Sequence, residues 1–250
     1  MKITFLNHAS FIIETNKFKI CIDPYLFGSA FNNGWNLLSE ENHKEELKNI
    51  THIFYSHEHP DHFSIPFINS IETKNCKDIE ILFQETYDKK LKKFCENKDF
   101  KFRELKNNKE LNFCDELFIT CGKVPFFDSW VNFNINNVNI LNVNDCVLEN
   151  PKLVHNIKKI LNRKIQILFT QFSYANSDTE LDQKNLAIKQ LEKIKLQDKI
   201  LQPDNIVPFA SFIYFSTGHL LVGPLAEKPI QTCLKLLSNL YSFFAFSILL

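Results

Sequence analysis

The segment from Ser56 to His62 limits what this 250-residue chain can fold into more than any other part of the sequence. It reads Ser-His-Glu-His-Pro-Asp-His and so contains four strong metal-ligating side chains. His57 and His59 are two residues apart, so an extended backbone directs both imidazoles to one side, where they can bind one ion. Pro60 predicts a turn that directs Asp61 and His62 toward a second, neighbouring ion. A solvated histidine-rich loop is the alternative, but the density of ligands favours a metal site.

The composition bounds the class of protein. A chain of 250 residues with 44% hydrophobic content can bury one large core, which predicts one domain. Lys and Arg together number 29, as do Asp and Glu, so no charge excess favours nucleic acid or a membrane as a partner. The seven cysteines include no C-x-x-C pair, and His8 comes too early for the apolar core of a signal peptide. We therefore expect a reduced, cytoplasmic protein.

Apolar runs separated by turn residues predict strands in both halves of the chain, with helices between them. The expected strands are 4–14, 17–22, 51–56, 79–84, 117–121, 130–135, 138–143 and 165–170. The expected helices are 39–49, a helix that begins at Ser64, 87–98, 150–162 and 180–196. Asn136 and Asn137 predict a hairpin turn. This pattern predicts two packed sheets with helices outside them.

Several motifs together, in this order along the chain, resemble the metallo-β-lactamase superfamily. They are Asn7-His8-Ala9-Ser10, Ile22-Asp23-Pro24, the histidine-rich segment and Asn142-Val143-Asn144-Asp145-Cys146. The resemblance implies an α/β (α+β) fold, an αββα four-layer sandwich with a metal site at the edge of its two sheets. Three further segments resemble the catalytic half of CMP-N-acetylneuraminate hydroxylase: Asp23–Leu26, Ala30–Trp35 and Leu201–Ala210. We expect the family domain to cover residues 1–219 and a divergent tail, 220–250, to lie outside it.

The resemblance also implies ligand roles for particular residues. His57 and His59 would bind a first ion, and Asp61 and His62 a second. Asp145 would bridge the two ions, although a strand-terminal Asp can instead accept hydrogen bonds from backbone N–H groups. Asp61 and His62 are the candidate catalytic residues, and either Asp61 or Asp145 would orient the metal-activated water.

Other residues are expected around these ligands. Asp23 would hydrogen-bond a ligand imidazole and fix its tautomer. His8 would either act in the same way or be an ordinary buried histidine. The loop that contains Asn32, Asn33 and Trp35 would face the substrate, or would be a packed aromatic loop with no such role.

Two departures from the superfamily pattern are visible. The third histidine of the first ion would align with Val124, which cannot bind a metal. Asp128 is close enough in sequence to supply an oxygen ligand, or else serves a turn or a helix cap. The first site would then be weakened, empty, or suited to iron or manganese. The second departure is the tail after His219, a residue that falls near the position of the last histidine ligand.

These observations support three functions. The first is a metal-dependent hydrolase with one or two divalent ions, zinc foremost, acting on a nucleotide-linked or amino sugar or on a related phosphodiester or amide. The second is an oxygenase that hydroxylates an N-acyl nucleotide sugar and needs a separate electron-donor protein with a Rieske centre. The third is an inactive ligand-binding remnant. In the first two cases the partner is a small-molecule substrate.

Overall fold

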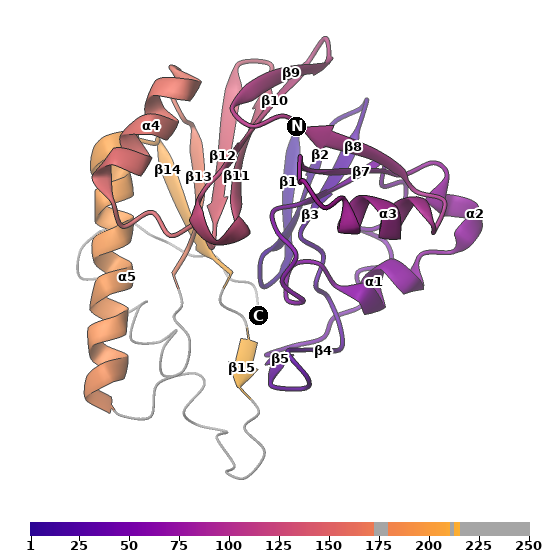
Figure 1. Ribbon diagram of the computed structural model, residues 1–250, viewed down its shortest axis with the longest axis horizontal. Coiled ribbons are helices and arrows are strands. Elements are labelled where there is room, and N and C mark those ends of the chain that lie inside the picture. Colours follow the sequence, from indigo (N-terminus) through magenta and orange to yellow (C-terminus); the bar gives the residue numbers. More distant parts are fainter. Residues whose placement is uncertain (173–179, 211–212, 216–250) are drawn as a thin grey trace.

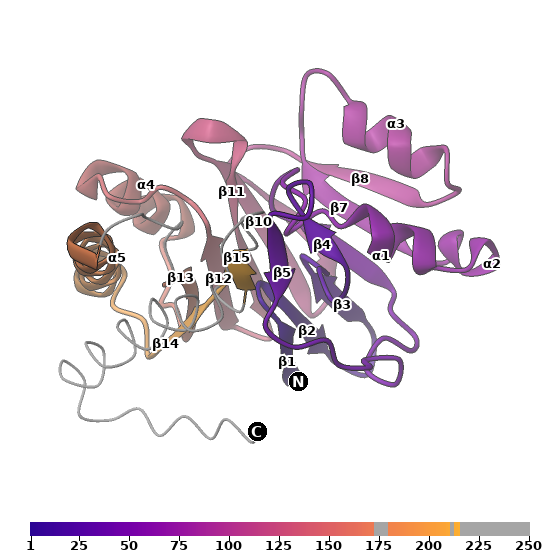
Figure 2. The same cartoon turned by 90° about the horizontal axis from the view of Figure 1, so that it is seen from below.

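Two six-stranded sheets face each other, and helices cover the outer face of each. The computed structural model describes residues 1–172, 180–210 and 213–215. Helices α1 (Ile65–Ser70), α2 (Thr73–Cys76) and α3 (Lys90–Glu96) lie outside the first sheet. Helices α4 (Pro151–Leu161) and α5 (Glu180–Leu201) lie outside the second (Figures 1 and 2). The four layers confirm the predicted αββα sandwich.

In the first sheet, the ends of two neighbouring strands, and the loops that follow them, lie side by side. Its order is β1-β2-β3-β6-β7-β8, with β1 Lys2–Asn7, β2 Ser10–Glu14, β3 Lys19–Ile22, β6 His52–Tyr55, β7 Glu80–Gln84 and β8 Lys101–Leu105. Strands β1 to β3 are antiparallel, and β3, β6, β7 and β8 are parallel. Because β3 and β6 are parallel neighbours, Asp23 and the histidine-rich segment follow them at the same edge.

The second sheet presents one strand end to the same edge of the sandwich. Its order is β14-β13-β12-β11-β10-β9, with β9 Lys109–Cys114, β10 Leu117–Lys123, β11 Ser129–Ile135, β12 Val138–Asn144, β13 Ile167–Gln171 and β14 Asn205–Phe209. Strand β12 ends immediately before Asp145, and a short 3-10 turn, η1 (Pro125–Phe127), precedes Asp128. A third, small sheet joins β15 (Ile213–Phe215), β5 (Trp35–Leu37) and β4 (Ser29–Ala30).

Phenylalanine side chains form much of the contact between the two large sheets. Phe11 of the first sheet stacks on Phe169 of the second, with ring centroids 4.2 Å apart. Phe54 and Phe133 meet edge to face at 5.8 Å. All four rings are at most 4% exposed, and burying each contributes about 1.5–3 kcal/mol. The site at the edge of the sandwich therefore lies next to a densely packed core.

The structure corrects two predicted elements. The run 4–14 is not one strand: Asn7 to Ser10 forms a turn between β1 and β2, with His8 in the left-handed region at φ 41°. The segment 39–49 forms turns rather than a helix, because it has few apolar residues to bury on one helical face. The predicted start at Ser64 is confirmed, since its hydroxyl accepts a hydrogen bond from Phe67 N.

The described part of the chain contains no helix that is long and apolar enough to cross a bilayer. His219 and the predicted tail, residues 220–250, lie outside the described residues. The predicted boundary between domain and tail stays a prediction.

Gly122 on β10 allows the indole ring of Trp130 on β11 to lie directly against the backbone. A methyl group at Gly122 would overlap the Trp130 ring and the Asn108 side chain, and Trp130 is only 2% exposed. We therefore expect Gly122→Ala to lower the free energy of unfolding by about 1–3 kcal/mol or more. Urea denaturation measures this change, and unaltered stability would contradict the position of the ring.

Candidate metal centre

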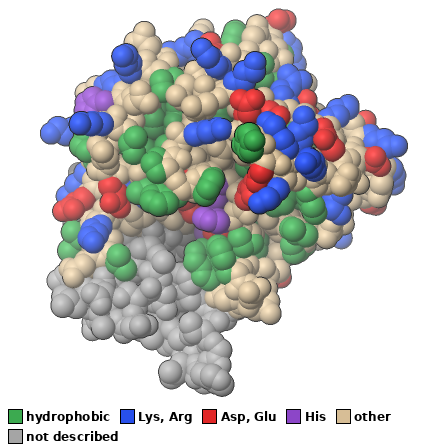
Figure 3. Space-filling view, viewed as in Figure 1, with side chains coloured by type: hydrophobic (Ala, Val, Ile, Leu, Met, Phe, Trp, Pro, Cys, Tyr) green, Lys and Arg blue, Asp and Glu red, His purple; other side chains and the backbone are tan. Residues whose placement is uncertain are grey.

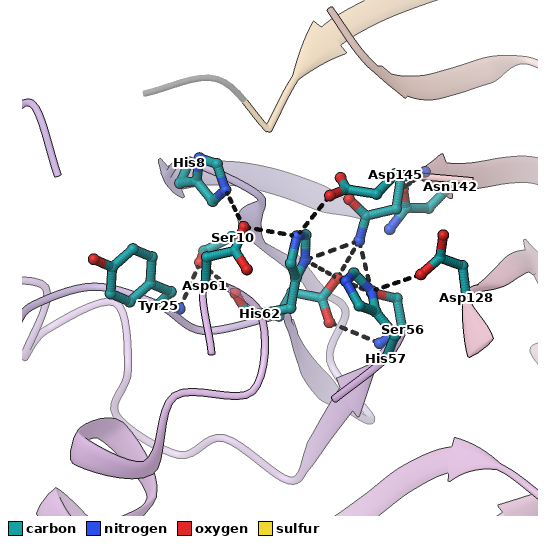
Figure 4. A network of polar contacts seen from close by, with 12 residues as sticks. His8, Ser10, Tyr25, Ser56, His57, Asp61, His62, Asp128, Asn142 and Asp145 are labelled. Carbon is teal, nitrogen blue, oxygen red and sulfur yellow. Dashed lines mark hydrogen bonds and ion pairs between the residues drawn. The ribbon is translucent and has the colours of Figure 1, made fainter. Parts of the chain in front are cut away.

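Four strand ends and one loop converge at this edge of the sandwich (Figure 4). His8 follows β1, Asp23 follows β3, and the segment from Ser56 to His62 follows β6. Asp145 follows β12, and Asp128 lies between η1 and β11. The predicted ligands therefore meet because both sheets contribute to one edge.

Three of these junctions contain a residue with left-handed backbone. The φ angles are 41° at His8, 40° at Asp23 and 43° at Asn144. Side chains other than glycine adopt this region at an energetic cost, and such residues concentrate at functional sites. Each turns the chain sharply at a strand end, so that the polar side chains face one another instead of continuing along the sheet.

Asp23 is the fully buried acceptor that organises the group. Its carboxylate accepts hydrogen bonds at 2.7 Å from both Ser56 N and Ser56 Oγ. It also accepts one from Asn144 Nδ2, and His62 Nδ1 lies 3.3 Å away. Since a carboxylate only accepts, Nδ1 of His62 carries a proton toward Asp23, and its Nε2 faces the opposite side. The contact with His62 is the one expected for Asp23, and its role toward a metal ligand stays a prediction.

The same network sets the tautomer of His57. The hydroxyl of Ser56 donates to Asp23, so toward His57 Nδ1, 2.9 Å away, it can only accept. Nδ1 of His57 then carries the proton, and Nε2 is left as a free lone pair. Burial, and next the neighbouring His62, lower the pKa of His57 to about 4. His57 is therefore a neutral imidazole at pH 7, the form that binds metals.

His62 lies between two carboxylates. Its Nε2 is 3.4 Å from Asp61 Oδ2 and 3.3 Å from Asp145 Oδ2. Burial disfavours a charged imidazole, but the charges of Asp145 and Asp61 raise the pKa of His62 well above its usual value. Likewise, burial raises the pKa of Asp61, yet His62 and His8 hold it well below the usual range. The cluster therefore favours a positive charge at its centre, which a divalent ion would supply.

Asp128 lies beside His57 and His59, the pair for which the resemblance implied a third histidine ligand at Val124. Its Oδ1 lies 3.8 Å from His57 Nδ1, and ligand atoms of His57, His59 and Asp128 lie within 4.8 Å of one another. Burial, and next the charge of Asp145, raise the pKa of Asp128 to about 7. Val124 instead packs against the apolar cluster formed with α4 and α5. Of the two roles considered for Asp128, this placement favours the oxygen ligand.

Three groups of potential ligands can be drawn from this site, and they share residues. The groups are His57 with His59 and Asp128, His57 with His62 and Asp145, and His8 with Asp61 and His62. Several of their buried atoms have no hydrogen-bond partner among the described residues: His57 Nε2, His62 Nε2, Asp61 Oδ1, Asp128 Oδ1 and Asp145 Oδ1. Buried polar atoms without partners are costly, and imidazole nitrogens with carboxylate oxygens are a ligand set for divalent ions. The residues present therefore suit the binding of divalent metal ions.

The loop predicted to face the substrate is close to His59, mainly through Phe31. The Phe31 ring centroid lies 6.1 Å from that of His59 and 4.5 Å from that of Trp35. Asn33 accepts a hydrogen bond from Ser29 Oγ within the loop, and Asn32 is exposed. Trp35 is half-buried against Tyr25 and its neighbours. A substrate role for Asn32, Asn33 and Trp35 stays a prediction.

Sequence reasoning assigned no role to two residues that hold the site together. Ser56 and Asn144 link Asp23 to His57 and to β12, and Asn144 Nδ2 lies 2.8 Å from Ser56 Oγ. Both belong to motifs that the sequence made visible, directly before His57 and Asp145. Their position beside ligands was the available signal, because groups that orient metal ligands usually flank them.

Comparisons with known proteins agree with this architecture. The family described as the beta-lactamase superfamily domain matches residues 2–182. A metal-dependent hydrolase of the UPF0173 family from Mesorhizobium japonicum is 42% identical over 65 residues, 26% of this chain and 24% of that protein. The cytidine monophosphate-N-acetylneuraminic acid hydroxylase of Cricetulus griseus is 34% identical over 88 residues, 34% of this chain and 16% of that protein. The chain thus matches about a quarter or less of the length of these curated relatives.

Several solved structures match more than nine tenths of the chain. The isothiocyanate hydrolase from Delia radicum gut bacteria has a TM-score of 0.62, 20% sequence identity and 92% coverage of both chains. At this identity the likeness concerns the fold alone. Since the family match covers most of the sequence and the sandwich has the same fold, the chain belongs to the beta-lactamase superfamily, with the metallo-β-lactamase fold.

Proposed function

We propose that this chain is a metal-dependent hydrolase that acts on a small molecule and holds two divalent ions. The observation that carries the proposal is a set of buried ligand atoms without a hydrogen-bond partner in the described part of the chain, on His57, His62, Asp61, Asp128 and Asp145. In this assignment His57, His59 and Asp128 hold the first ion, and Asp61 and His62 hold the second. Asp145 faces both groups, which suits the bridging role expected from the family resemblance.

The residues of the site suit hydrolysis. A bound divalent ion supplies a water whose pKa lies near 7, and hence hydroxide at neutral pH. Asp61 keeps a low pKa, so it stays ionised, and its Oδ1 has no partner within the described residues. That oxygen can accept a hydrogen bond from the attacking water and orient it. Asp23 holds His62 in the tautomer that presents Nε2.

The rim of the site supports a substrate with an apolar portion. Phe31 beside His59 is 41% exposed, and Phe126 and Phe127, directly before Asp128, are 72% and 90% exposed. Gln84 Nε2 donates a hydrogen bond to the Phe127 carbonyl at 2.5 Å and so fixes this loop. Figure 3 shows hydrophobic side chains on both sides of a histidine at the centre of this face. We propose a nucleotide-linked or amino sugar with an N-acyl group, or a related amide or phosphodiester, as the substrate.

A hydrolysis panel tests the proposal. Protein stripped with a chelator and reloaded with zinc, manganese or iron is assayed on aryl esters, anilides, lactones and bis(p-nitrophenyl) phosphate. We expect turnover of at least one class that disappears on stripping and returns on reloading. Protein that retains tightly bound metal but hydrolyses none of these classes would count against a hydrolase.

One observation favours the second candidate, an oxygenase that needs a separate electron donor. Asp128 lies close to His57 and His59, where it would supply an oxygen ligand in place of a nitrogen ligand, and such a set suits iron better than an all-nitrogen set does. Metal analysis of protein purified without added metal separates the two functions. About two equivalents of zinc would favour the hydrolase. Bound iron, with oxygen consumption when a reduced Rieske protein is added, would favour the oxygenase.

A further inference from the structure

We propose that His8 binds the second metal ion directly, through Nε2, together with Asp61 and His62. This inference rests on the proposed metal centre and adds a ligand from the first turn of the chain. His8 lies at the end of β1, 53 residues before Asp61 in the sequence, and its side chain is 2% exposed. Figure 4 shows its ring directed at Asp61, on the side away from Asp145.

The distances around Asp61 fit shared coordination. His8 Nε2 lies 3.4 Å from Asp61 Oδ2, and His62 Nε2 lies 3.4 Å from the same oxygen. Two ligand atoms in a tetrahedral site with bonds of about 2.1 Å lie about 3.4 Å apart. Both separations therefore have the length of an edge of such a site.

A hydrogen bond explains the contact between His8 and Asp61 less well. An N–H donor on a carboxylate normally lies about 2.7–2.9 Å from its oxygen, well below the observed 3.4 Å. Coordination to one ion explains why two buried imidazoles approach the same carboxylate oxygen at 3.4 Å, which is long for a hydrogen bond.

The backbone of His8 is held by contacts from both large sheets. His8 N donates to the side-chain oxygen of Asn7 at 2.9 Å, and Ala210, directly after β14, donates its N–H to His8 O at 2.9 Å. These bonds keep His8 in its left-handed conformation at φ 41°. A conformation that costs energy and is fixed from both sides indicates a residue placed for a function.

Cobalt titration of the stripped protein, followed by proton NMR, tests the inference. Co²⁺ shifts the N–H signals of bound imidazoles far outside the normal range, so each signal reports one bound histidine. We expect two equivalents of Co²⁺ in the unaltered protein. In His8→Asn the second equivalent should bind more than about 100-fold more weakly, beyond the usual cost of losing an outer partner. At saturating Co²⁺ one shifted N–H signal should be missing.

The choice of Asn keeps the test from depending on folding, because Asn adopts left-handed backbone more readily than most residues. His43, another buried histidine that lies outside these ligand groups, provides the matched control His43→Asn, which should retain both equivalents and every shifted signal. A complete set of shifted signals in His8→Asn would overturn the inference, as would a single equivalent of Co²⁺ in the unaltered protein. Binding of no metal at all would instead overturn the proposed function.

Discussion

His59→Ala should lose the first metal ion and more than about 100-fold of the hydrolytic activity, while its stability stays unchanged. His59 supplies one of the nitrogens in the first ligand group, and removing a direct ligand should exceed the 10–100-fold cost of losing an outer partner. Its side chain is exposed, so the free energy of unfolding of the metal-free protein should change by less than about 0.5 kcal/mol. Metal analysis, an activity assay and urea denaturation measure the three quantities.

The matched control is His155→Ala. His155 is an exposed histidine on α4, where its ring contacts the carbonyl of Pro151. This variant should keep its metal, its activity and its stability. If His59→Ala bound the first ion as tightly as the unaltered protein, the assignment of that ligand group would be wrong. A large loss of stability in metal-free His59→Ala would show that the residue is structural.

Asp23→Ala should lower the free energy of unfolding of the metal-free protein by about 3–5 kcal/mol. The change removes the buried acceptor of Ser56 N and Ser56 Oγ and one of the two acceptors of Asn144 Nδ2. Each buried group that loses its partner costs about 1–3 kcal/mol. Urea denaturation of both stripped proteins gives the difference, and a loss below about 1 kcal/mol would mean that these groups find other partners.

A second variant separates stability from metal binding. Asp23→Asn keeps the shape of the side chain and one acceptor oxygen. Its new amide N–H group would face the N–H donor of the Asn144 side chain. We expect it to fold and to bind metal about 10–100-fold more weakly, because His62 loses the group that fixes its tautomer. Asp78→Ala, at an exposed aspartate, is the control that should change neither quantity.

Much of the fold could be predicted from the sequence because local patterns decided it. Asn136 and Asn137 have φ angles of 50° and 67°, as the predicted tight hairpin requires. Asn150 caps α4 through a hydrogen bond from Lys152 N, in agreement with the predicted start. The split between β1 and β2 could not be predicted, because the turn at His8 depends on the distant Ala210.

The same distinction between local and distant contacts applies to the candidate site. His57, His59, Asp61 and His62 are close in sequence, so their pattern alone predicted a metal centre. Asp128 and His8 lie in other loops of the chain, and each also had an ordinary structural explanation in the sequence. The strand order of the first sheet places His8 within 3.4 Å of Asp61, and the packing of the two sheets places Asp128 within 3.8 Å of His57. Contacts between residues far apart in sequence are set by the whole fold.

Anomalous diffraction from crystals grown with zinc tests the central claim most directly, because it locates each ion. Two peaks about 3.5–4 Å apart are expected at this edge of the sandwich. One should lie within bonding distance of His57, His59 and Asp128, and the other within bonding distance of Asp61 and His62. The absence of any peak near His57 and His62, or ions bound only elsewhere on the chain, would contradict the claim that this edge is a binuclear metal centre.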